Sequence, residues 1–359
     1  MSSVRIMTRD FSNPLTLPPV ELKPVRYAAH AIGGPKTAEI AVTAVDGDSR
    51  GIWELLEWLR CPVEIYDKNE SCVWWGYVAG VTINVGAISV SVSLDSMSNR
   101  VAAMYSTAEN QKATTDWVQD DASVSVYGTK EILLTSSIIG VDMAEYIRDV
   151  MLSFAKKPVS GREIGDAGEI SASLECRGWW STLDWKYYSA IDGTAVDTVN
   201  QIANMVTACG QFLIGTEIKG GNGLYCSPFR DGTNTALFEI IELLNVGDGS
   251  GNRLLATVTK SREVVVNVEP TLNTNNIGIF IKENGSVEDK WGNPAYASAC
   301  PVGVWAQLKD VIPGSLDFGL LADPTVFFVE EAEFDVEKER YYPLAKGQST
   351  SIGTRINEG

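Results

Sequence analysis

The residues with the clearest chemical potential are clustered aromatic side chains: Trp74 and Trp75, Trp179 and Trp180, and Trp185 with Tyr187 and Tyr188. Such rings stack on sugars, and two carboxylates flanking a glycosidic bond can cleave it. Asp184 lies inside the second cluster, and Glu175 precedes it. Adjacent side chains of a strand point to opposite faces, so at most one ring of each adjacent pair can share a surface. We therefore favour one ring of each pair packing in the core and the other lying at a subunit interface. We predict no catalytic pair of acids.

A second group has the spacing of metal ligands. Asp46, Asp48, Glu54 and Glu57 fall near the positions of a calcium-binding loop. Arg50 stands where that loop should offer an oxygen, and its cation would oppose calcium. A strand-to-helix turn with an aspartate cap explains the same residues, so we predict no metal site.

Two glycine-rich loops and one histidine complete the candidates. Gly247–Arg253 follows an expected helix and precedes an expected strand, which is the reverse of the order in a phosphate-binding loop. Gly33–Lys36 lacks the second glycine and the hydroxyl of a P-loop. His30 is the single histidine, which excludes most zinc sites and Ser-His-Asp triads and favours a hydrogen-bonded structural role. The sequence therefore predicts no catalytic, cofactor-binding or metal-binding residues.

Composition limits the partners. The chain has 359 residues, 29 Lys and Arg against 46 Asp and Glu, and a net charge of −17. Such a chain has no cation excess with which to displace counterions from nucleic acid, so sequence-specific binding of DNA or RNA is not expected. No apolar run reaches the length of a membrane span, and the start has no signal-peptide pattern. We expect synthesis and folding in the cytoplasm.

The six cysteines form no C-x-x-C pair, and free, buried thiols are expected. Cys61 and Cys72 flank one expected hairpin and could face each other.

The elements that must position these residues follow from hydrophobic periodicity and turn signals. The expected strands and hairpins cover 38–45, 63–66 with 72–78, 88–94, a segment around Val124 and Val126, and 254–259 with 263–268. The alternation over 88–94 predicts one face in the core and one polar face. The expected helices cover 52–60, 141–155, 199–210 and 237–247, and residues 161–168 are expected to be a linker.

Several side chains carry finer predictions. In the helix over 141–155, a stripe of Ile147, Val150, Met151 and Phe154 should face the core, after a capping-box-like start at Asp142 and Glu145. Glu239 and Glu242 should lie on the solvent-exposed side of the helix over 237–247. The acidic run 330–339 is expected to be a solvated face, and residues 346–359 a mobile polar tail unless a partner holds them.

Two helix-to-hairpin units, 52–78 and 236–268, suggest a structural repeat. The predicted fold is α+β and β-rich, with two split-barrel-like domains, short helices and extended terminal arms. The expected ranges are an N-terminal arm (1–26), a first β-rich domain (27–130), a helical connector (131–168), a second α+β domain (169–324) and an acidic C-terminal segment with a polar tail (325–359).

Three stretches resemble tail proteins of tailed bacteriophages, and most closely the baseplate-hub or tail-tip family: Ala31–Lys36, Trp53–Tyr77 and Arg230–Ile241. In that family a polar Arg/Asp-Gly-x-Thr-Ala-Leu helix start recurs before a hairpin, and two split-barrel-like domains alternate in one chain. The resemblance extends in organisation over the larger part of residues 27–270. The chain departs from the family in carrying no added lysozyme, peptidase or zinc module, and its acidic C-terminal segment has no counterpart there.

The resemblance implies a non-enzymatic structural protein of the virion tail that needs no cofactor. It implies a homotrimer whose paired domains form a pseudo-sixfold ring, which caps the tail tube, connects it to the tip or fibres and forms a conduit for DNA ejection. The implied partners are the tail tube protein, the distal tail protein, the tape-measure protein and tail fibre or tip proteins. One alternative is a distal-tail or other adaptor with a six-fold ring; another, of a different class, is a glycan-binding or glycan-hydrolysing tail protein.

Overall fold

The computed structural model describes residues 2–45, 50–109, 111–135, 140–221, 223–272, 277–283, 285–294, 297–309 and 325–346. The predicted β-rich α+β fold is confirmed, since strands dominate and the helices are short. The polar tail predicted after Lys346 lies outside the described residues.

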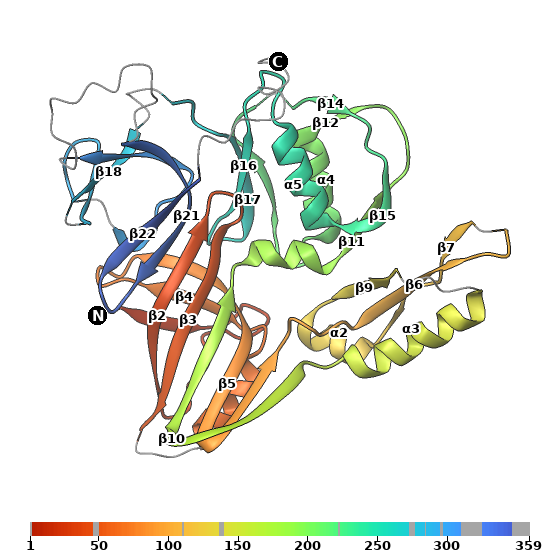
Figure 1. Cartoon of the computed structure of the whole chain (residues 1–359), viewed down its shortest axis with the longest axis horizontal. Helices are drawn as coiled ribbons and strands as arrows, with labels where there is room; N and C mark the ends of the chain where they lie inside the picture. Colours follow the sequence, from red (N-terminus) through yellow and green to blue (C-terminus); the bar gives the residue numbers. More distant parts are fainter. Residues whose placement is uncertain are drawn as a thin grey trace.

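The largest sheet has eleven strands and joins segments from both ends of the chain (Figure 1). Its strand order is β1-β4-β5-β10-β3-β2-β21-β20-β18-β19, and β22 adds to β21. The strands of its first half are β1 (Ser3–Ile6), β2 (Val20–His30), β3 (Gly34–Ala44), β4 (Pro62–Tyr66), β5 (Cys72–Ser93) and β10 (Val159–Arg177). The strands of its second half are β18 (Ile277–Lys282), β19 (Val287–Asp289), β20 (Val304–Lys309), β21 (Val326–Asp335) and β22 (Arg340–Lys346), with a short 3₁₀ helix, η4 (Ala297–Ala299), before β20.

The expected hairpin of β4 and β5 is confirmed, and the helix before it is a short α1 (Arg50–Glu54) continued by a 3₁₀ turn, η2 (Leu55–Trp58). In this hairpin Cys72 pairs with Tyr66, whereas the Cys61 carbonyl accepts a hydrogen bond from Val78. The two cysteines therefore do not face each other, and all six cysteines are free thiols.

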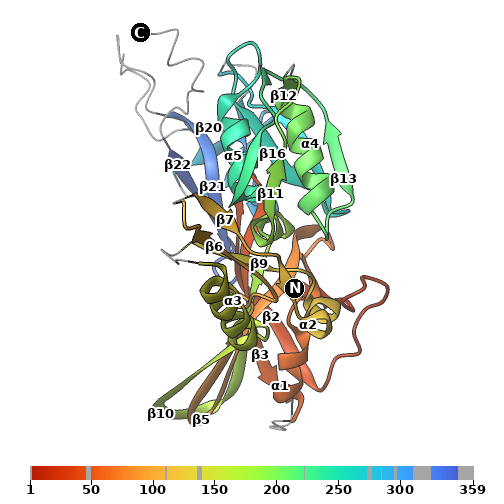
Figure 2. The same cartoon turned by 90° about the vertical axis from the view of Figure 1, so that its right-hand side faces the viewer.

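The distal halves of β5 and β10 leave the sheet as a two-stranded ribbon, which projects at the lower left of Figure 2. Two predictions are wrong here. Residues 161–168 are part of β10, not a linker, because they pair with β5. The strand over 88–94 does not place one face in the core, contrary to the prediction; of its apolar residues only Leu94 is buried. Ile88 is 53% exposed and its cross-strand partner Ile164 is 88% exposed, because no third layer covers the ribbon.

An arm follows the ribbon (Figure 1). It consists of β6 (Arg100–Ser106), β7 (Lys112–Thr114), β8 (Val118–Gln119), α2 (Asp121–Tyr127), β9 (Glu131–Leu134) and α3 (Val141–Ala155). The strand predicted around Val124 and Val126 is wrong, because these residues lie in α2. Asp120 caps that helix by accepting a hydrogen bond from the Ser123 amide at 2.9 Å.

A helical unit lies at the other end of the molecule (Figure 1). It starts with a 3₁₀ helix, η3 (Trp179–Trp185), and contains α4 (Thr198–Cys209) and α5 (Ala236–Val246), which confirm the two predicted helices. The predicted hairpin is β16 (Leu254–Val258) with β17 (Glu263–Val268), to which β13 (Gly215–Ile218) adds in parallel. The remaining strands pair in twos: β11 (Tyr187–Ala190) with β15 (Arg230–Thr235), and β12 (Val196–Asp197) with β14 (Tyr225–Cys226).

On α5, Glu242 is exposed as predicted, but Glu239 is only 9% exposed. Glu239 forms an ion pair with Arg230 at 2.5 Å, and Asn234 donates a second hydrogen bond to it. The prediction of a solvated Glu239 is wrong, because a cation on the preceding strand makes burial of that carboxylate possible.

Candidate assembly interface

The aromatic clusters belong to the core. Trp179, Trp180 and Trp185 are all buried, because η3 turns them inward from a 3₁₀ helix where a strand would have alternated them. The ring centroid of Trp179 lies 5.1 Å from that of Tyr77 and 5.6 Å from that of Phe212. The expectation of one ring in the core and one at an interface is therefore wrong for Trp179 and Trp180. Rings packed in this way offer no face on which a sugar could stack.

The two acids considered with these rings serve other contacts. Asp184 is exposed and accepts a hydrogen bond at 2.7 Å from the hydroxyl of Thr235, the residue that caps α5. Glu175 is exposed on β10, where it pairs with Glu39 of β3.

Of the four carboxylates with calcium-loop spacing, Asp46 and Asp48 lie outside the described residues. Glu54 and Glu57 are exposed, on α1 and η2 respectively. Within the described ranges, His, Cys, Asp and Glu side chains form no group of three that could hold a metal ion.

Both glycine-rich loops are connections. In the loop after α5, the Asp248 carboxylate accepts hydrogen bonds from the amides of Ser250 and Asn252 at 2.9 and 2.8 Å, as predicted for a turn. The turn between β2 and β3 docks on β16, because the Gly33 amide donates to the Ala256 carbonyl at 2.6 Å. Gly33 has φ +100°, and a Cβ atom there would lie 2.5 Å from the Trp180 ring.

His30 is a structural histidine, as predicted: its Nδ1 accepts a hydrogen bond from the Ile32 amide at 3.0 Å. Burial lowers the pKa of His30 from its ordinary value, against the opposing charges of Glu330 and Glu331. The Nε2 atom of His30 lies 3.9 Å from the Glu330 carboxylate.

The acidic run is solvated at its end, where Glu337 and Glu339 are exposed as predicted, but not at its start. Residues 330–335 lie in β21, and Glu330 is only 4% exposed. Arg253 holds Glu330 through two hydrogen bonds, at 2.9 and 2.7 Å, and contacts Glu269 at 3.4 Å. A bidentate pair of this kind ties the C-terminal strand to the start of β16, so the prediction of a solvated run is wrong for Glu330.

The strongest candidate for a functional surface is the outer face of α3. Its exposed apolar residues recur at the three- and four-residue spacing of one helix face: Met143 (53% exposed), Tyr146 (67%), Val150 (36%) and Phe154 (80%). We call this set the α3 face. The opposite side of α3 buries small or hydrogen-bonded residues, among them Ala144 against Ala103 of β6.

The sequence correctly predicted α3 but assigned Val150 and Phe154 to the core. The correction follows from the thin layer beneath the helix, because β6 and α3 meet through alanines and leave the large side chains outside. The predicted capping box is also absent: Gly140 is the N-cap, and no side chain caps this helix. Large apolar side chains gathered on one exposed helix face mark an interaction surface.

A second set of exposed apolar side chains belongs to the helical unit, around β11, β14, β15 and α5: Ile191, Leu224, Tyr225, Phe229 and Phe238. We call these the exposed helical-unit residues. Tyr225 is 73% and Ile191 89% exposed. The chain thus presents apolar residues on two different elements, the arm and the helical unit.

No helix in the described segments combines the length and apolarity that a membrane crossing requires.

No protein-family model matches the sequence, and no curated protein sequence matches it. Among solved structures, the fold is similar to the tail protein from Neisseria meningitidis MC58 (7% identity, 93% of this chain and 91% of that chain, TM-score 0.42). It is also similar to the 43 kDa tail protein of prophage MuSo2 from Shewanella oneidensis (7%, 93% and 92%, 0.40) and to the prophage tail protein gp18 from Listeria monocytogenes (9%, 99% and 99%, 0.36).

Proposed function

We propose that this chain is a structural protein of a phage tail, and within the tail the hub at its tip. The single observation that carries the proposal is the α3 face, since Tyr146 and Phe154 are exposed on an arm that projects from the main sheet (Figure 1). A surface of this kind suits assembly by burial of apolar area. The resemblance of the sequence to the hub family supplies the identity of the assembly.

We further propose that the copies form a homotrimer. The α3 face and the exposed helical-unit residues are different surfaces, so contact between one on a first copy and the other on a second is head-to-tail. Head-to-tail contacts give a closed ring when the rotation between successive copies closes, and the proposed trimer is such a ring. The net charge of −17 suits a ring around DNA, because a wall of like charge does not bind the passing duplex.

In this proposal the ring lies at the end of the virion tail, on the tail tube, and contacts the distal tail, tape-measure and fibre or tip proteins. The proposed role is assembly, with no catalysis and no cofactor. The five ranges given above remain proposed domains, and strands from the first, second and C-terminal ranges share one sheet.

Native mass measurement of the purified assembly tests the ring. The proposal expects three times the 39.0 kDa of one chain, whereas six copies would favour a distal-tail adaptor. Electron microscopy of tails carrying a C-terminal label tests the location. Label at the end distal to the capsid supports the hub, and label along the tube or on the head contradicts it.

The glycan alternative is tested separately, by incubating the protein with cell-wall and surface polysaccharides. The burial of Trp179, Trp180 and Trp185 supports the structural role over this alternative, because buried rings present no face to a sugar. Release of reducing ends would contradict a purely structural role.

A further inference from the structure

The arm joins the rest of the molecule through polar contacts at its base. Between β6 and α3 the arm has a small core of its own, in which Ala103 and Ala144 form a cluster separate from the main hydrophobic core. That main core is continuous through the large sheet and the helical unit. Among the described apolar side chains of the arm, Tyr127 alone packs against it. The direction in which the arm points therefore depends on the polar groups around Tyr127.

Gln211, which follows α4 in the helical unit, binds the backbone of the arm through both atoms of its amide group. Its Oε1 atom accepts a hydrogen bond from the Thr129 amide at 2.8 Å, and its Nε2 atom donates to the Thr129 carbonyl at 2.6 Å. The next residue, Phe212, packs under Gly128, where φ is +84° and a Cβ atom would lie 2.4 Å from the Phe212 ring. Two bonds to one residue and a close backbone contact fix both the place and the direction of the chain between α2 and β9.

Arg60 joins three parts of the chain at the same place. Its Nη1 atom donates to the Arg9 carbonyl in the loop after β1 at 2.5 Å, and its Nη2 atom donates more weakly to the Val126 carbonyl of α2 at 3.4 Å. Its guanidinium carbon lies 5.2 Å from the centroid of the Phe212 ring. Arg60 is only 7% exposed, and burial, together with the nearby Arg9 cation, lowers the pKa of Arg60 to about 10. A buried cation costs free energy that an apolar side chain of similar volume would not, so its presence here favours a role in fixing one arrangement.

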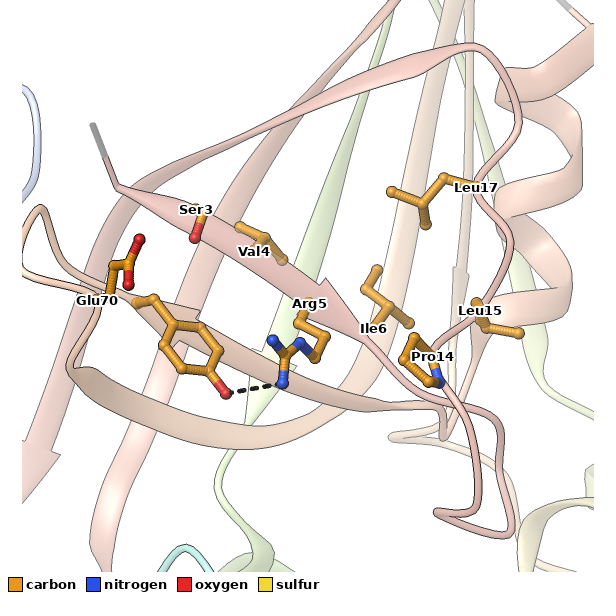
Figure 3. Close-up of a pocket in the computed structure, with 9 residues that line it drawn as sticks. Ser3, Val4, Arg5, Ile6, Pro14, Leu15, Leu17 and Glu70 are labelled. Atoms are coloured by element: carbon orange, nitrogen blue, oxygen red, sulfur yellow. Dashed lines mark hydrogen bonds between the residues drawn. The ribbon is translucent and has the colours of Figure 1, made fainter.

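The loop that offers the Arg9 carbonyl is itself anchored on the large sheet. It leaves β1 after Ile6 and returns beside that strand at Pro14 (Figure 3), where the Leu15 amide donates to the Ile6 carbonyl at 2.9 Å. The Nε atom of Arg9 donates to the Leu59 carbonyl, also at 2.9 Å. The arm is therefore held against a part of the molecule that is tied to the sheet.

The other side of this contact is closed by Glu131 of β9, which is held from both units. One of its carboxylate oxygens accepts a hydrogen bond from the Tyr187 amide of β11 at 2.8 Å, and the other accepts one from Arg100 of β6 at 2.7 Å. The ring centroids of Tyr187 and Trp117 are 5.9 Å apart, so an aromatic pair spans the two units beside this bond. We call Gln211, Arg60 and Glu131, with the groups that they bind, the arm junction. Hydrogen bonds are directional, and a satisfied network of them specifies one arrangement of the parts that it joins.

We propose that Gln211 and Arg60 are positioning residues, which fix the direction in which the arm presents the α3 face. The proposal rests on the proposed function in one respect, since in a ring of identical copies this direction sets the rotation from one copy to the next. A head-to-tail contact closes into a ring only when that rotation is a whole fraction of a turn. An arm free to pivot would present the same apolar residues at many angles, and rings of several sizes or open chains would form.

A distance measurement by pulsed electron spin resonance tests the positioning. Spin labels replace the exposed Ser153 of α3 and Glu242 of α5, in dilute full-length protein that carries Phe154→Ala to keep the chains apart. The intact junction should give one narrow distribution of distances. Gln211→Ala should widen that distribution at least about twofold, because the arm loses both hydrogen bonds that hold Thr129.

The matched control removes a glutamine of the same kind from α4. The Nε2 atom of Gln201 donates to the carbonyls of Val196 and Cys226, so its bonds lie inside the helical unit and do not reach the arm. Gln201→Ala should leave the distance distribution as narrow as that of the intact junction.

A second variant and a second measurement keep the test independent of whether Gln211→Ala folds. Arg60→Met fills similar space without donors and should widen the same distribution. In Gln211→Ala the Tyr187 amide, which binds Glu131 across the junction, should exchange its hydrogen at least about tenfold faster than in the wild type. Narrow distributions in both variants would overturn the proposal, and so would a Tyr187 amide that exchanges at the wild-type rate.

The assembled protein separates positioning from contact. With Phe154 in place, Gln211→Ala should give several ring masses or open chains, whereas Phe154→Ala should keep one ring mass and only raise the protein concentration at which it forms. A single, wild-type ring mass in Gln211→Ala would overturn the role of the junction in assembly. A wild type that forms no ring would contradict the proposed function instead, and the distance measurement on single chains would still decide whether the junction positions the arm.

Discussion

Replacing Phe154 by alanine tests the α3 face directly. The side chain is 80% exposed, so its removal takes little packing from the folded chain. We expect the free energy of unfolding to change by less than about 0.5 kcal/mol, as for other surface substitutions.

Assembly should respond much more strongly. Full burial of a phenylalanine contributes about 1.5–3 kcal/mol, so burial of the exposed four fifths in an interface contributes about 2 kcal/mol per contact. That free energy corresponds to a dissociation constant about 30-fold higher for each contact in the variant. A closed ring repeats the contact in every subunit, so the ring should dissociate at much higher protein concentration than the wild type.

Sedimentation velocity or mass photometry over a concentration series measures this shift. The matched control is Trp291→Ala, which removes another aromatic ring, 75% exposed, from the turn after β19. The control should assemble as the wild type does. If Phe154→Ala and the wild type have the same oligomer distribution at every concentration, the α3 face is not the interface and the reasoning fails.

Three further predictions concern the core. Gly33→Ala should lower the free energy of unfolding by about 2–4 kcal/mol, because the residue has a left-handed backbone conformation and its new Cβ atom would clash with the Trp180 ring. Thermal denaturation measures this loss, and an unchanged midpoint of unfolding would contradict the geometry. Arg253→Ala should lower the free energy of unfolding, measured by urea denaturation, by about 3 kcal/mol or more, because it leaves the buried Glu330 carboxylate without its bidentate partner. The control Arg26→Ala, which removes an exposed ion pair with Glu39, should lower it by less than about 1 kcal/mol. The pKa of His30 is lowered in the folded state, so its contribution to stability is present above the ordinary histidine pKa of about 6.5 and is lost as pH falls through the folded pKa. His30→Gln should flatten this part of the pH dependence of unfolding, and an identical slope in the variant would refute the assignment.

The sequence determined much of the local structure. Hydrophobic periodicity predicted α3, α4 and α5, although the capping box expected at the start of α3 is absent, and turn signals predicted the hairpins β4–β5 and β16–β17. These features depend on residues close in the chain, so a single sequence contains them. The acidic balance and the single histidine likewise follow from composition alone.

Only the tertiary structure decided which faces are covered. Phe154 and Ile88 have the spacing of core residues, yet no layer packs over them. Glu330 and Glu239 are charged residues in acidic stretches that predicted a solvent-exposed surface, and they are buried beside arginines. Whether a side chain is buried depends on elements far away in the sequence, and the sequence pattern of one element does not specify its neighbour. The arm junction is of the same kind, because Gln211 and Thr129 are far apart in the sequence and meet only once the helical unit lies beside the arm.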